Sequence, residues 1–230
     1  MTMIVENLHH VQTRITQACA QAGRARDAVR LLAVSKTFDV DAVRQAHAAG
    51  QTAFGENYIQ EAVDKIQALR HLPLEWHCIG PIQSNKTRLV AEHFDWVHTI
   101  DRLKIAQRLS EQRPVHLAPL QVCIQVNVDG GASKSGVTAS EALALAQAVA
   151  ALPRLRLRGL MCIPEPAPDF IAACEVFAGA RALLDEIKLA GVPLDTLSMG
   201  MSADLEAAVA SGSTMVRVGS AIFGQRGLTS

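Results

Sequence analysis

Short apolar runs alternate with amphipathic segments along almost the whole chain. The apolar runs are rich in aliphatic and β-branched residues, which is typical of strands covered on both faces of a parallel sheet. The segments between them repeat apolar positions every three or four residues, which predicts helices, and a further helix is predicted over residues 3–24. The predicted strands are residues 31–35, 52–57, 75–80, 96–100, 120–128, 157–163, 194–199 and 215–219.

Residues that favour helix ends stand between these segments. Asp39 and Asp101 are predicted N-caps, and Thr138 with Glu141 has the spacing of a capping box. Gly50 and Gly191 are placed to end helices. The boundaries therefore agree with the apolar pattern.

Eight strands that alternate with helices over 230 residues predict an α/β protein, a single (β/α)8 TIM barrel with an extra N-terminal helix. We expect residues 1–230 to form a single TIM-barrel domain, since no Pro/Gly/Ser-rich linker divides the chain. An open, doubly wound sheet is the alternative. It is less favoured because the turn after the first strand lacks a Gly-x-Gly-x-x-Gly pattern.

Composition removes several classes of partner. The chain has 22 basic and 22 acidic residues, so no net charge attracts nucleic acid or a membrane surface. Its 5 cysteines are odd in number and lie in apolar segments, which indicates a reducing, cytoplasmic setting. No signal peptide and no membrane span are expected. Metal binding is not predicted, because Cys-x-x-Cys and His-Glu-x-x-His patterns are absent from the sequence.

Chemically competent residues cluster where predicted strands end. Lys36 follows the first strand, and an amine placed there can form a Schiff base with an aldehyde, although most such lysines are solvated loop residues. In a barrel, all the strand ends share one rim, where active sites lie. The residues collected there are Lys36, Asn57, His77, Gly80, Ser84, Asn85, Asn127, Lys134, Met161, Ser198, Met201, Ser202, Arg217, Gly219 and Ser220.

The last two strand ends favour phosphate binding. Glycine and serine occur together in Ser198-Met-Gly-Met-Ser202 and in Gly219-Ser220, and barrels often bind phosphate between the loops after strands seven and eight. The glycines could instead serve only tight turns. Arg217 interrupts the apolar eighth strand, and it could contact a ligand ring nitrogen or form a salt bridge in the core.

Other chemistries have less support. His77 and the adjacent Cys78 point to opposite faces of a strand, so they cannot share a metal ion, and His77 could be a core histidine. No serine lies in a Gly-x-Ser-x-Gly turn, so a serine hydrolase is not indicated. Lys134 lies in a Gly- and Ser-containing loop, where a solvated surface lysine is the simpler interpretation.

Several segments resemble the YggS/PROSC-type pyridoxal phosphate homeostasis proteins, over nearly the whole chain. These segments are Ala-Val-Ser-Lys36, Phe-Gly-Glu-Asn57-Tyr, Trp-His77-Cys-Ile-Gly80-Pro-Ile-Gln-Ser-Asn85-Lys, Lys134-Ser-Gly, Gly159-Leu-Met161, Leu-Ser198-Met-Gly-Met-Ser202 and Val-Arg217-Val-Gly219-Ser-Ala-Ile-Phe-Gly224. The resemblance implies a barrel like the N-terminal domain of alanine racemase. It also implies that pyridoxal 5′-phosphate (PLP) is bound.

The resemblance assigns roles to individual residues. Lys36 would form the internal aldimine and Arg217 would face the pyridine nitrogen. Asn57, His77 and Met201 would line the pocket, Ser202, Gly219 and Ser220 would hold the phosphate, and Lys134 would be a secondary PLP contact. The tail has no lysine after Lys188, so roles of C-terminal lysines in relatives do not transfer to this chain.

The implied function is a non-enzymatic PLP-binding protein that stores, carries or regulates the cofactor. PLP-dependent apo-enzymes are possible partners, and a monomer is expected. The alternative is a PLP-dependent amino-acid racemase, which needs an acid or base opposite Lys36; the only tyrosine is Tyr58, so no second base is identified apart from a cysteine, His77 or a partner chain. A phosphosugar Schiff-base aldolase would also use a strand-end lysine.

Overall fold

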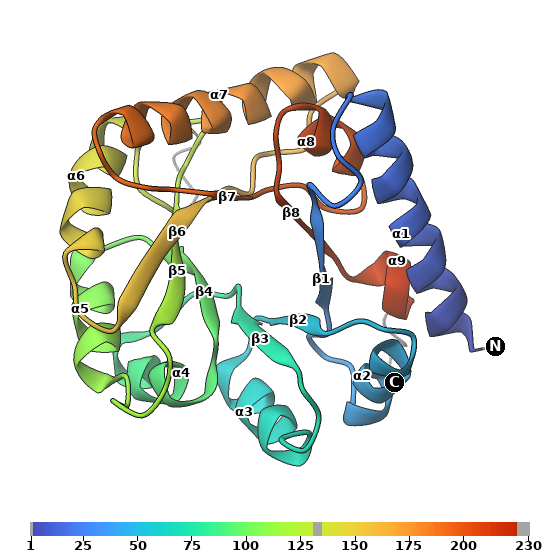
Figure 1. Cartoon of the computed structure of the whole chain (residues 1–230), viewed down its shortest axis with the longest axis horizontal. Coiled ribbons are helices and arrows are strands. Elements are labelled where there is room, and N and C mark those ends of the chain that lie inside the picture. Colours follow the sequence, from blue (N-terminus) through green and yellow to red (C-terminus); the bar gives the residue numbers. More distant parts are fainter. Residues whose placement is uncertain (1, 131–134, 225–230) are drawn as a thin grey trace.

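The computed structural model describes residues 2–130 and 135–224, and within them eight parallel strands close into a barrel (Figure 1). Each strand pairs with the next, and β8 pairs with β1 through Leu32 and Arg217. This closing pair confirms the predicted barrel and excludes the open sheet. The strands are β1 (Arg30–Val34), β2 (Ala53–Glu56), β3 (Glu75–Cys78), β4 (Trp96–Ile100), β5 (Leu120–Gln125), β6 (Leu155–Met161), β7 (Thr196–Ser198) and β8 (Met215–Val218).

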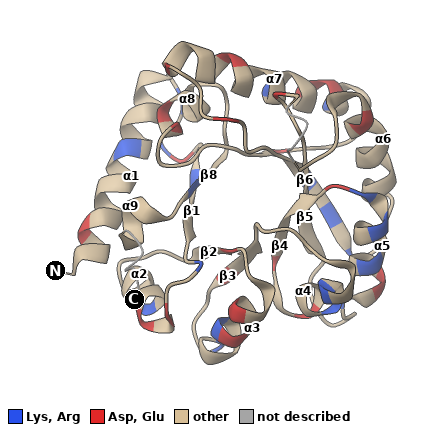
Figure 2. Cartoon of the chain, turned by 180° about the vertical axis from the view of Figure 1, so that it is seen from behind, with Lys and Arg blue, Asp and Glu red and all other residues tan. Residues whose placement is uncertain are grey.

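Helices surround the barrel, and Figure 2 shows acidic and basic residues distributed along them. Their polar faces meet solvent while their apolar faces cover the sheet. The helices are α1 (Met3–Gln21), α2 (Val40–Ala48), α3 (Ile59–Ala68), η1 (Ser84–Lys86), α4 (Thr87–His93), α5 (Leu103–Gln112), α6 (Ala139–Ala150), α7 (Phe170–Leu189), α8 (Leu205–Ala210) and α9 (Ser220–Phe223).

Most predicted helix boundaries are confirmed, with one clear difference. The Asp39 side chain accepts a hydrogen bond from the Ala42 N–H at 2.9 Å, and the Thr138 capping box is formed. Asp101 is not the N-cap of α5, because that position is taken by Arg102, whose side chain makes no capping hydrogen bond. The prediction for Asp101 is therefore wrong by one residue.

The predicted strand over residues 120–128 is too long. Regular pairing of β5 ends at Gln125, and Val126 forms only an isolated bridge with Val137. The apolar run of the sequence therefore extends beyond the regular strand. Helix α9 is absent from the prediction because a helix of 4 residues is too short to show periodicity.

Two apolar layers hold the fold together. The larger layer lies between the strands and the helices, and a smaller one lies inside the barrel. The inner layer also contains buried polar side chains, among them His77, His98, Ser198 and Arg217. Alternate residues of each strand point inward, which places these groups together.

The extra helix α1 supports the loops after β7 and β8. It packs beside α8 and α9 (Figure 1). The Arg14 guanidinium donates to the backbone oxygen of Ser202 at 3.0 Å and to Glu206 at 2.9 Å. The Asn7 side chain donates to the backbone oxygen of Ile222 at 3.0 Å. The N-terminal helix thus fixes both loops that were predicted to bind phosphate.

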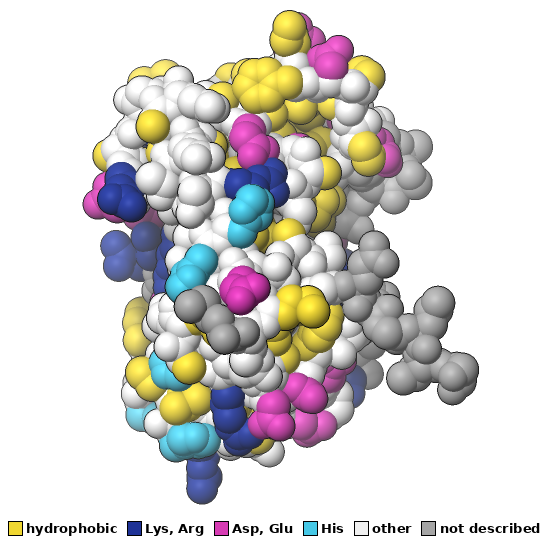
Figure 3. Space-filling view, turned by 90° about the vertical axis from the view of Figure 1, so that its right-hand side faces the viewer, with side chains coloured by type: hydrophobic (Ala, Val, Ile, Leu, Met, Phe, Trp, Pro, Cys, Tyr) yellow, Lys and Arg dark blue, Asp and Glu magenta, His cyan; other side chains and the backbone are white. Residues whose placement is uncertain are grey.

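The surface agrees with the balanced composition. Figure 3 shows acidic, basic, histidine and apolar side chains interspersed on the face that lies to the right in Figure 1. In the part of the chain that the structure describes, no helix has the length and apolar character needed to cross a bilayer.

Candidate functional site

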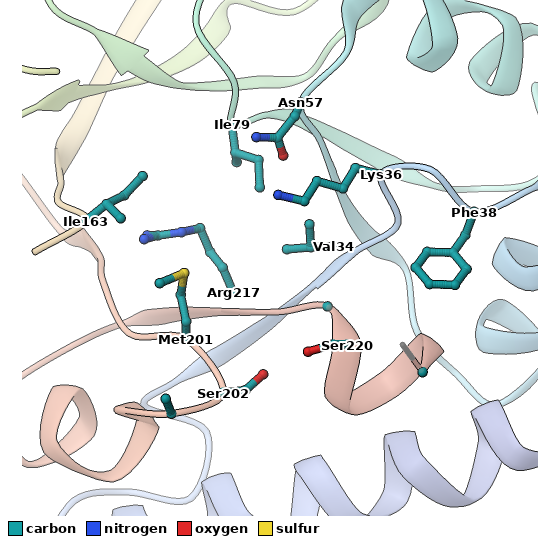
Figure 4. Close-up of a pocket in the computed structure, with 13 residues that line it drawn as sticks. Val34, Lys36, Phe38, Asn57, Ile79, Ile163, Met201, Ser202, Arg217 and Ser220 are labelled. Atoms are coloured by element: carbon teal, nitrogen blue, oxygen red, sulfur yellow. The ribbon is translucent and has the colours of Figure 1, made fainter. Parts of the chain in front are cut away.

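A cavity of about 400 Å³ opens where the carboxyl ends of the strands meet, and it contains most of the predicted site residues. Figure 4 shows the side chains of Lys36, Asn57 and Arg217 directed into it, with Ser202 and Ser220 nearby at the side of α9. The complete lining is Val34, Lys36, Phe38, Asn57, Ile79, Ile163, Met201, Ser202, Ala203, Arg217, Gly219, Ser220 and Gly224.

Lys36 lies in a tight turn whose flanking residues are fixed by hydrogen bonds. The N–H of Phe38 donates to the Ser35 oxygen at 3.1 Å, and that oxygen also accepts from Lys65 Nζ at 2.8 Å. Thr37 has a φ of 68°, a left-handed conformation that is rare for a β-branched residue. Strain of this kind persists only where the surroundings enforce it, as they do around Lys36.

A buried ion pair lies behind this turn. Lys65 Nζ is 2.7 Å from Glu56 Oε1, and the Ser35 hydroxyl donates to the same oxygen at 2.6 Å. Lys65 also contacts Glu61 at 2.8 Å, which accepts from the Thr37 N–H. Burial raises the pKa of Glu56, while Lys65 and Ser35 oppose that shift. The pair therefore anchors the turn at the cost of a buried charge.

Lys65→Met is expected to lower the free energy of unfolding by about 3 kcal/mol at pH 7, because it leaves the Glu56 charge buried without its partner. The loss should be smaller at pH 5, where Glu56 takes up a proton more readily since its folded pKa is raised. Urea unfolding at both pH values measures this. The double variant Lys65→Met/Glu56→Gln should recover part of the loss, and no recovery would contradict the ion-pair account.

Arg217 is buried and makes two hydrogen bonds. Its Nη1 donates to Ser198 Oγ at 2.7 Å and its Nη2 donates to the backbone oxygen of Cys162 at 2.9 Å. Burial lowers the pKa of this guanidinium. Among the described residues, no carboxylate forms a salt bridge with it. The core salt bridge considered from the sequence is therefore not formed there, and the guanidinium faces the cavity.

The loops after β7 and β8 bring small polar groups to one side of the cavity. Gly200 has a φ of 97°, which only glycine adopts readily, and the next residue, Met201, donates its N–H to Asp204 at 2.6 Å. A Cβ at Gly219 would lie 3.3 Å from the Val34 oxygen, so glycine at this position allows the backbone after β8 to approach the end of β1 closely. Both loops therefore present hydroxyl and backbone groups to the cavity.

Of the residues that the resemblance assigns to PLP, one described residue does not line the cavity. His77 is completely buried in the barrel interior, one layer below Ile79, which does line the cavity. Its ring lies parallel to Trp96 at 5.2 Å. This differs from the expectation that His77 lines the pocket and agrees with the alternative of a core histidine. Lys134 lies outside the described residues.

His77 belongs to a polar group at the amino-terminal mouth of the barrel. Its Nε2 is 2.6 Å from Glu75 Oε1, and Arg30 Nη1 also lies 2.6 Å from that oxygen. Burial opposes ionisation of Glu75, but the contacts with His77 and Arg30 outweigh it and lower its pKa to about 2. Burial lowers the pKa of His77 and, well below its ordinary value, that of His98.

These pKa shifts predict acid sensitivity in two steps. A histidine whose folded pKa lies below 6.5 contributes stability above pH 6.5 that is lost as the pH falls. Glu75 adds a second loss between about pH 4.5 and pH 2, because its folded pKa is about 2. Urea unfolding of Glu75→Gln should lack the second loss, whereas Glu175→Gln, an exposed change on α7, should keep it. An unchanged acid profile in Glu75→Gln would refute the assignment.

Several lining residues were not singled out from the sequence. Val34, Phe38, Ile79 and Ile163 are apolar and lie at or just after strand ends, so only their position could have indicated them. Phe38 stacks on Phe223 at 5.1 Å, which closes the cavity beside α9. Among the described residues, no group of three or more His, Cys, Asp or Glu side chains is arranged to hold a metal ion.

Comparisons with known proteins place this architecture in a family. The profile of the alanine racemase N-terminal domain matches residues 7–227. The pyridoxal phosphate homeostasis protein of Pseudomonas aeruginosa is 60% identical over 226 residues, which cover 98% of this chain and 97% of that protein. The protein of the same name from Escherichia coli K12 is 54% identical over 229 residues, covering 98% of each chain.

A solved structure supports the same assignment. PipY of Synechococcus elongatus PCC7942, determined with PLP bound, superposes with a TM-score of 0.81 at 37% identity, covering 91% of this chain and 100% of that one. The sequence match extends over the whole barrel, including the cavity described above. The chain therefore belongs to the pyridoxal phosphate homeostasis protein family, whose barrel is that of the alanine racemase N-terminal domain.

Proposed function

We propose that this protein binds PLP in the cavity, holds it as a Schiff base on Lys36, and thereby stores, carries or regulates the cofactor. The observation that carries the proposal is the meeting of an amine, a guanidinium and two serines in one cavity of about 400 Å³. Each of these groups can contact one part of an aldehyde-bearing phosphorylated pyridine: the amine the aldehyde, the guanidinium the ring nitrogen and the serines the phosphate. The PLP in PipY and the names of the relatives support it.

The residues of the cavity fit this ligand. Asn57 Oδ1 is buried without a hydrogen-bond partner, so it is available to a donor group of a bound molecule. Arg217 would face the pyridine nitrogen as a hydrogen-bond donor, and Ser202, Gly219 and Ser220 would hold the phosphate. Met201 would cover the ring. PLP supplies an electrophilic aldehyde and an electron-accepting ring when it is bound.

The cavity favours binding over turnover. An arginine beside the ring nitrogen cannot readily give up the proton that would make the ring a strong electron sink. Tyr58 is 52% exposed and is not among the lining residues. Burial raises the pKa of Cys78 and of Cys123 to about 12, so neither thiol serves as a base near neutral pH. The second base of a racemase is therefore not found among the described lining residues.

A reconstitution experiment tests this function. Adding PLP to the purified protein should produce a yellow Schiff-base absorbance band that saturates at one equivalent of PLP. Incubation with L- or D-alanine followed by chiral analysis should show no turnover at ordinary enzyme rates. A protein that PLP cannot reconstitute would overturn the binding proposal. Racemisation at enzyme rates would replace it with the racemase alternative, and a phosphosugar aldolase would show no such band.

Arg14→Ala is expected to weaken PLP binding by about fivefold, because the guanidinium that fixes the Ser202 loop from α1 is removed. The yellow band should keep its position, since Arg14 does not line the cavity. Spectral titration with PLP measures both quantities. Arg26→Ala is the control. A wild-type affinity in Arg14→Ala would show that PLP binding does not depend on the contact between Arg14 and the Ser202 loop.

The proposed role in PLP supply implies recipient proteins and a cellular compartment. PLP-dependent apo-enzymes are the class of protein that would receive the cofactor, and we place the protein in the cytoplasm as a monomer. The free thiols of all five cysteines support a reducing compartment. Mixing the PLP-loaded protein with an apo-enzyme and following recovery of its activity tests the transfer.

A further inference from the structure

A chain of hydrogen bonds crosses the barrel interior and ends at Arg217. Glu75 Oε1 lies 2.6 Å from His77 Nε2, and His77 Nδ1 lies 2.8 Å from His98 Nε2. His98 Nδ1 is 2.8 Å from Ser198 Oγ, which accepts from Arg217 Nη1 at 2.7 Å. Glu75 is the first residue of β3, at the amino-terminal mouth, whereas Arg217 lines the cavity at the opposite mouth. The chain therefore connects the two ends of the barrel.

The two ends of the chain fix the direction of donation. A guanidinium has only donors, so Arg217 must donate to Ser198. The Glu75 carboxylate is ionised near neutral pH and has only acceptors, so it must accept from His77 Nε2. Arg30 donates to the same carboxylate and holds it in place.

The tautomers of both histidines follow from these ends. A neutral His77 that carries its proton on Nε2 presents Nδ1 as an acceptor, so His98 donates from Nε2. His98 Nδ1 is then an acceptor, and the Ser198 hydroxyl donates to it. The opposite order would direct the bare Nε2 of a neutral His77 at a carboxylate. Every bond in the chain therefore points from Arg217 toward Glu75.

Burial keeps the two histidines neutral. Both side chains are completely buried, which lowers the pKa of each. The charged and titratable groups that face His77 are Glu75, Arg30 and His98, and those that face His98 are His77 and Arg217. A proton added to this chain would oppose the Arg217 charge and reverse the bond between His98 and Ser198.

We propose that Glu75, His77, His98 and Ser198 form a positioning chain of fixed donor direction that orients the Arg217 guanidinium in the cavity. Arg217 has no carboxylate partner among the described residues, so the Ser198 oxygen and the Cys162 carbonyl set its orientation. The expected effect on PLP affinity rests on the proposed function, whereas the donor direction of the hydrogen bonds does not. Substitutions at the far mouth should therefore reach the cavity.

Nitrogen-15 NMR of the histidine-labelled protein without PLP tests the chain itself. At pH 7, His77 and His98 should both show the neutral ring protonated on Nε2, with signals assigned by their loss in His77→Gln and His98→Gln. Ser198→Ala should shift the Nδ1 signal of His98, because its donor is removed. An imidazolium or a ring protonated on Nδ1 at either position would overturn the proposal.

Spectral titration with PLP tests the effect on the cavity. Ser198→Ala is expected to weaken PLP binding about fivefold and Glu75→Gln about twofold, the latter keeping the side-chain shape at the mouth. Asp195→Asn is the matched control, because this carboxylate accepts hydrogen bonds from Arg158 and Thr196 and does not contact Glu75, His77, His98 or Ser198. Wild-type affinity in both chain variants would overturn the positioning role. If the wild-type protein binds no PLP, the proposed function fails, while the NMR result still decides the direction of the chain.

Discussion

Lys36→Ala is expected to abolish the yellow Schiff-base band and to weaken PLP binding by about a hundredfold, equivalent to about 3 kcal/mol. The covalent bond is lost, but the groups that would hold the phosphate and the ring remain in the cavity. Some PLP should therefore still bind, with the spectrum of the free aldehyde. Spectral titration and equilibrium dialysis measure the two effects separately.

The control for this change is Lys104→Ala, which removes an exposed lysine on α5. It should leave both the band and the affinity as they are in the wild-type protein. A band that persists in Lys36→Ala would assign the covalent link to another lysine. Among the described residues, no other lysine lines the cavity, so we do not expect another lysine to form the Schiff base in place of Lys36.

Arg217→Met is the second change with a large expected effect, and it should separate stability from binding. The unliganded protein should change its free energy of unfolding by no more than about 1 kcal/mol, because a buried charge without an ion-pair partner is replaced by an apolar side chain of similar length. PLP affinity should fall by at least about tenfold, because the donor that faces the ring nitrogen is lost. Urea unfolding and spectral titration measure these quantities.

Arg44→Met, an exposed change on α2, is the control and should alter neither quantity appreciably. If Arg217→Met destabilises the unliganded protein by several kcal/mol, the arginine is structural and the ligand does not explain its presence. If PLP affinity is unchanged, the guanidinium does not face the ring. The expected combination, a stable but weakly binding protein, is typical of residues retained for function.

The fold could be predicted from the sequence because its signal is repeated. Eight apolar runs separated by helical segments leave few architectures open, and the closing pair of β1 and β8 confirms the barrel. Strand ends were less certain: β5 stops at Gln125 although the apolar run continues to Val128. Hydrophobicity indicates burial, while the end of a strand depends on its neighbour's hydrogen bonds.

The cavity brings together predicted residues that lie within or shortly after the carboxyl ends of strands. Lys36, Asn57, Met201 and Arg217 meet there because parallel strands carry their ends to one rim. His77 was misplaced by one layer, since alternation along a strand shows that a side chain points inward without showing its depth in the barrel.

Long-range polar contacts could not be predicted from the sequence. Arg14 lies on the N-terminal helix and Glu206 on α8, and only the folded chain brings them to 2.9 Å. His98 on β4 likewise meets His77 on β3 at 2.8 Å, and only the folded barrel brings them together. Neither pair has a sequence spacing that indicates contact, because their partners are set by the closure of the barrel.

The central claim is a covalent bond between PLP and Lys36, and borohydride reduction followed by peptide mass mapping tests it most directly. The PLP-loaded wild-type protein should lose its yellow band on reduction and carry one phosphopyridoxyl group, located on the peptide that contains Lys36 in Ala-Val-Ser-Lys-Thr. Reduction that leaves the Lys36 peptide unmodified, or that labels a different lysine stoichiometrically, would contradict the account.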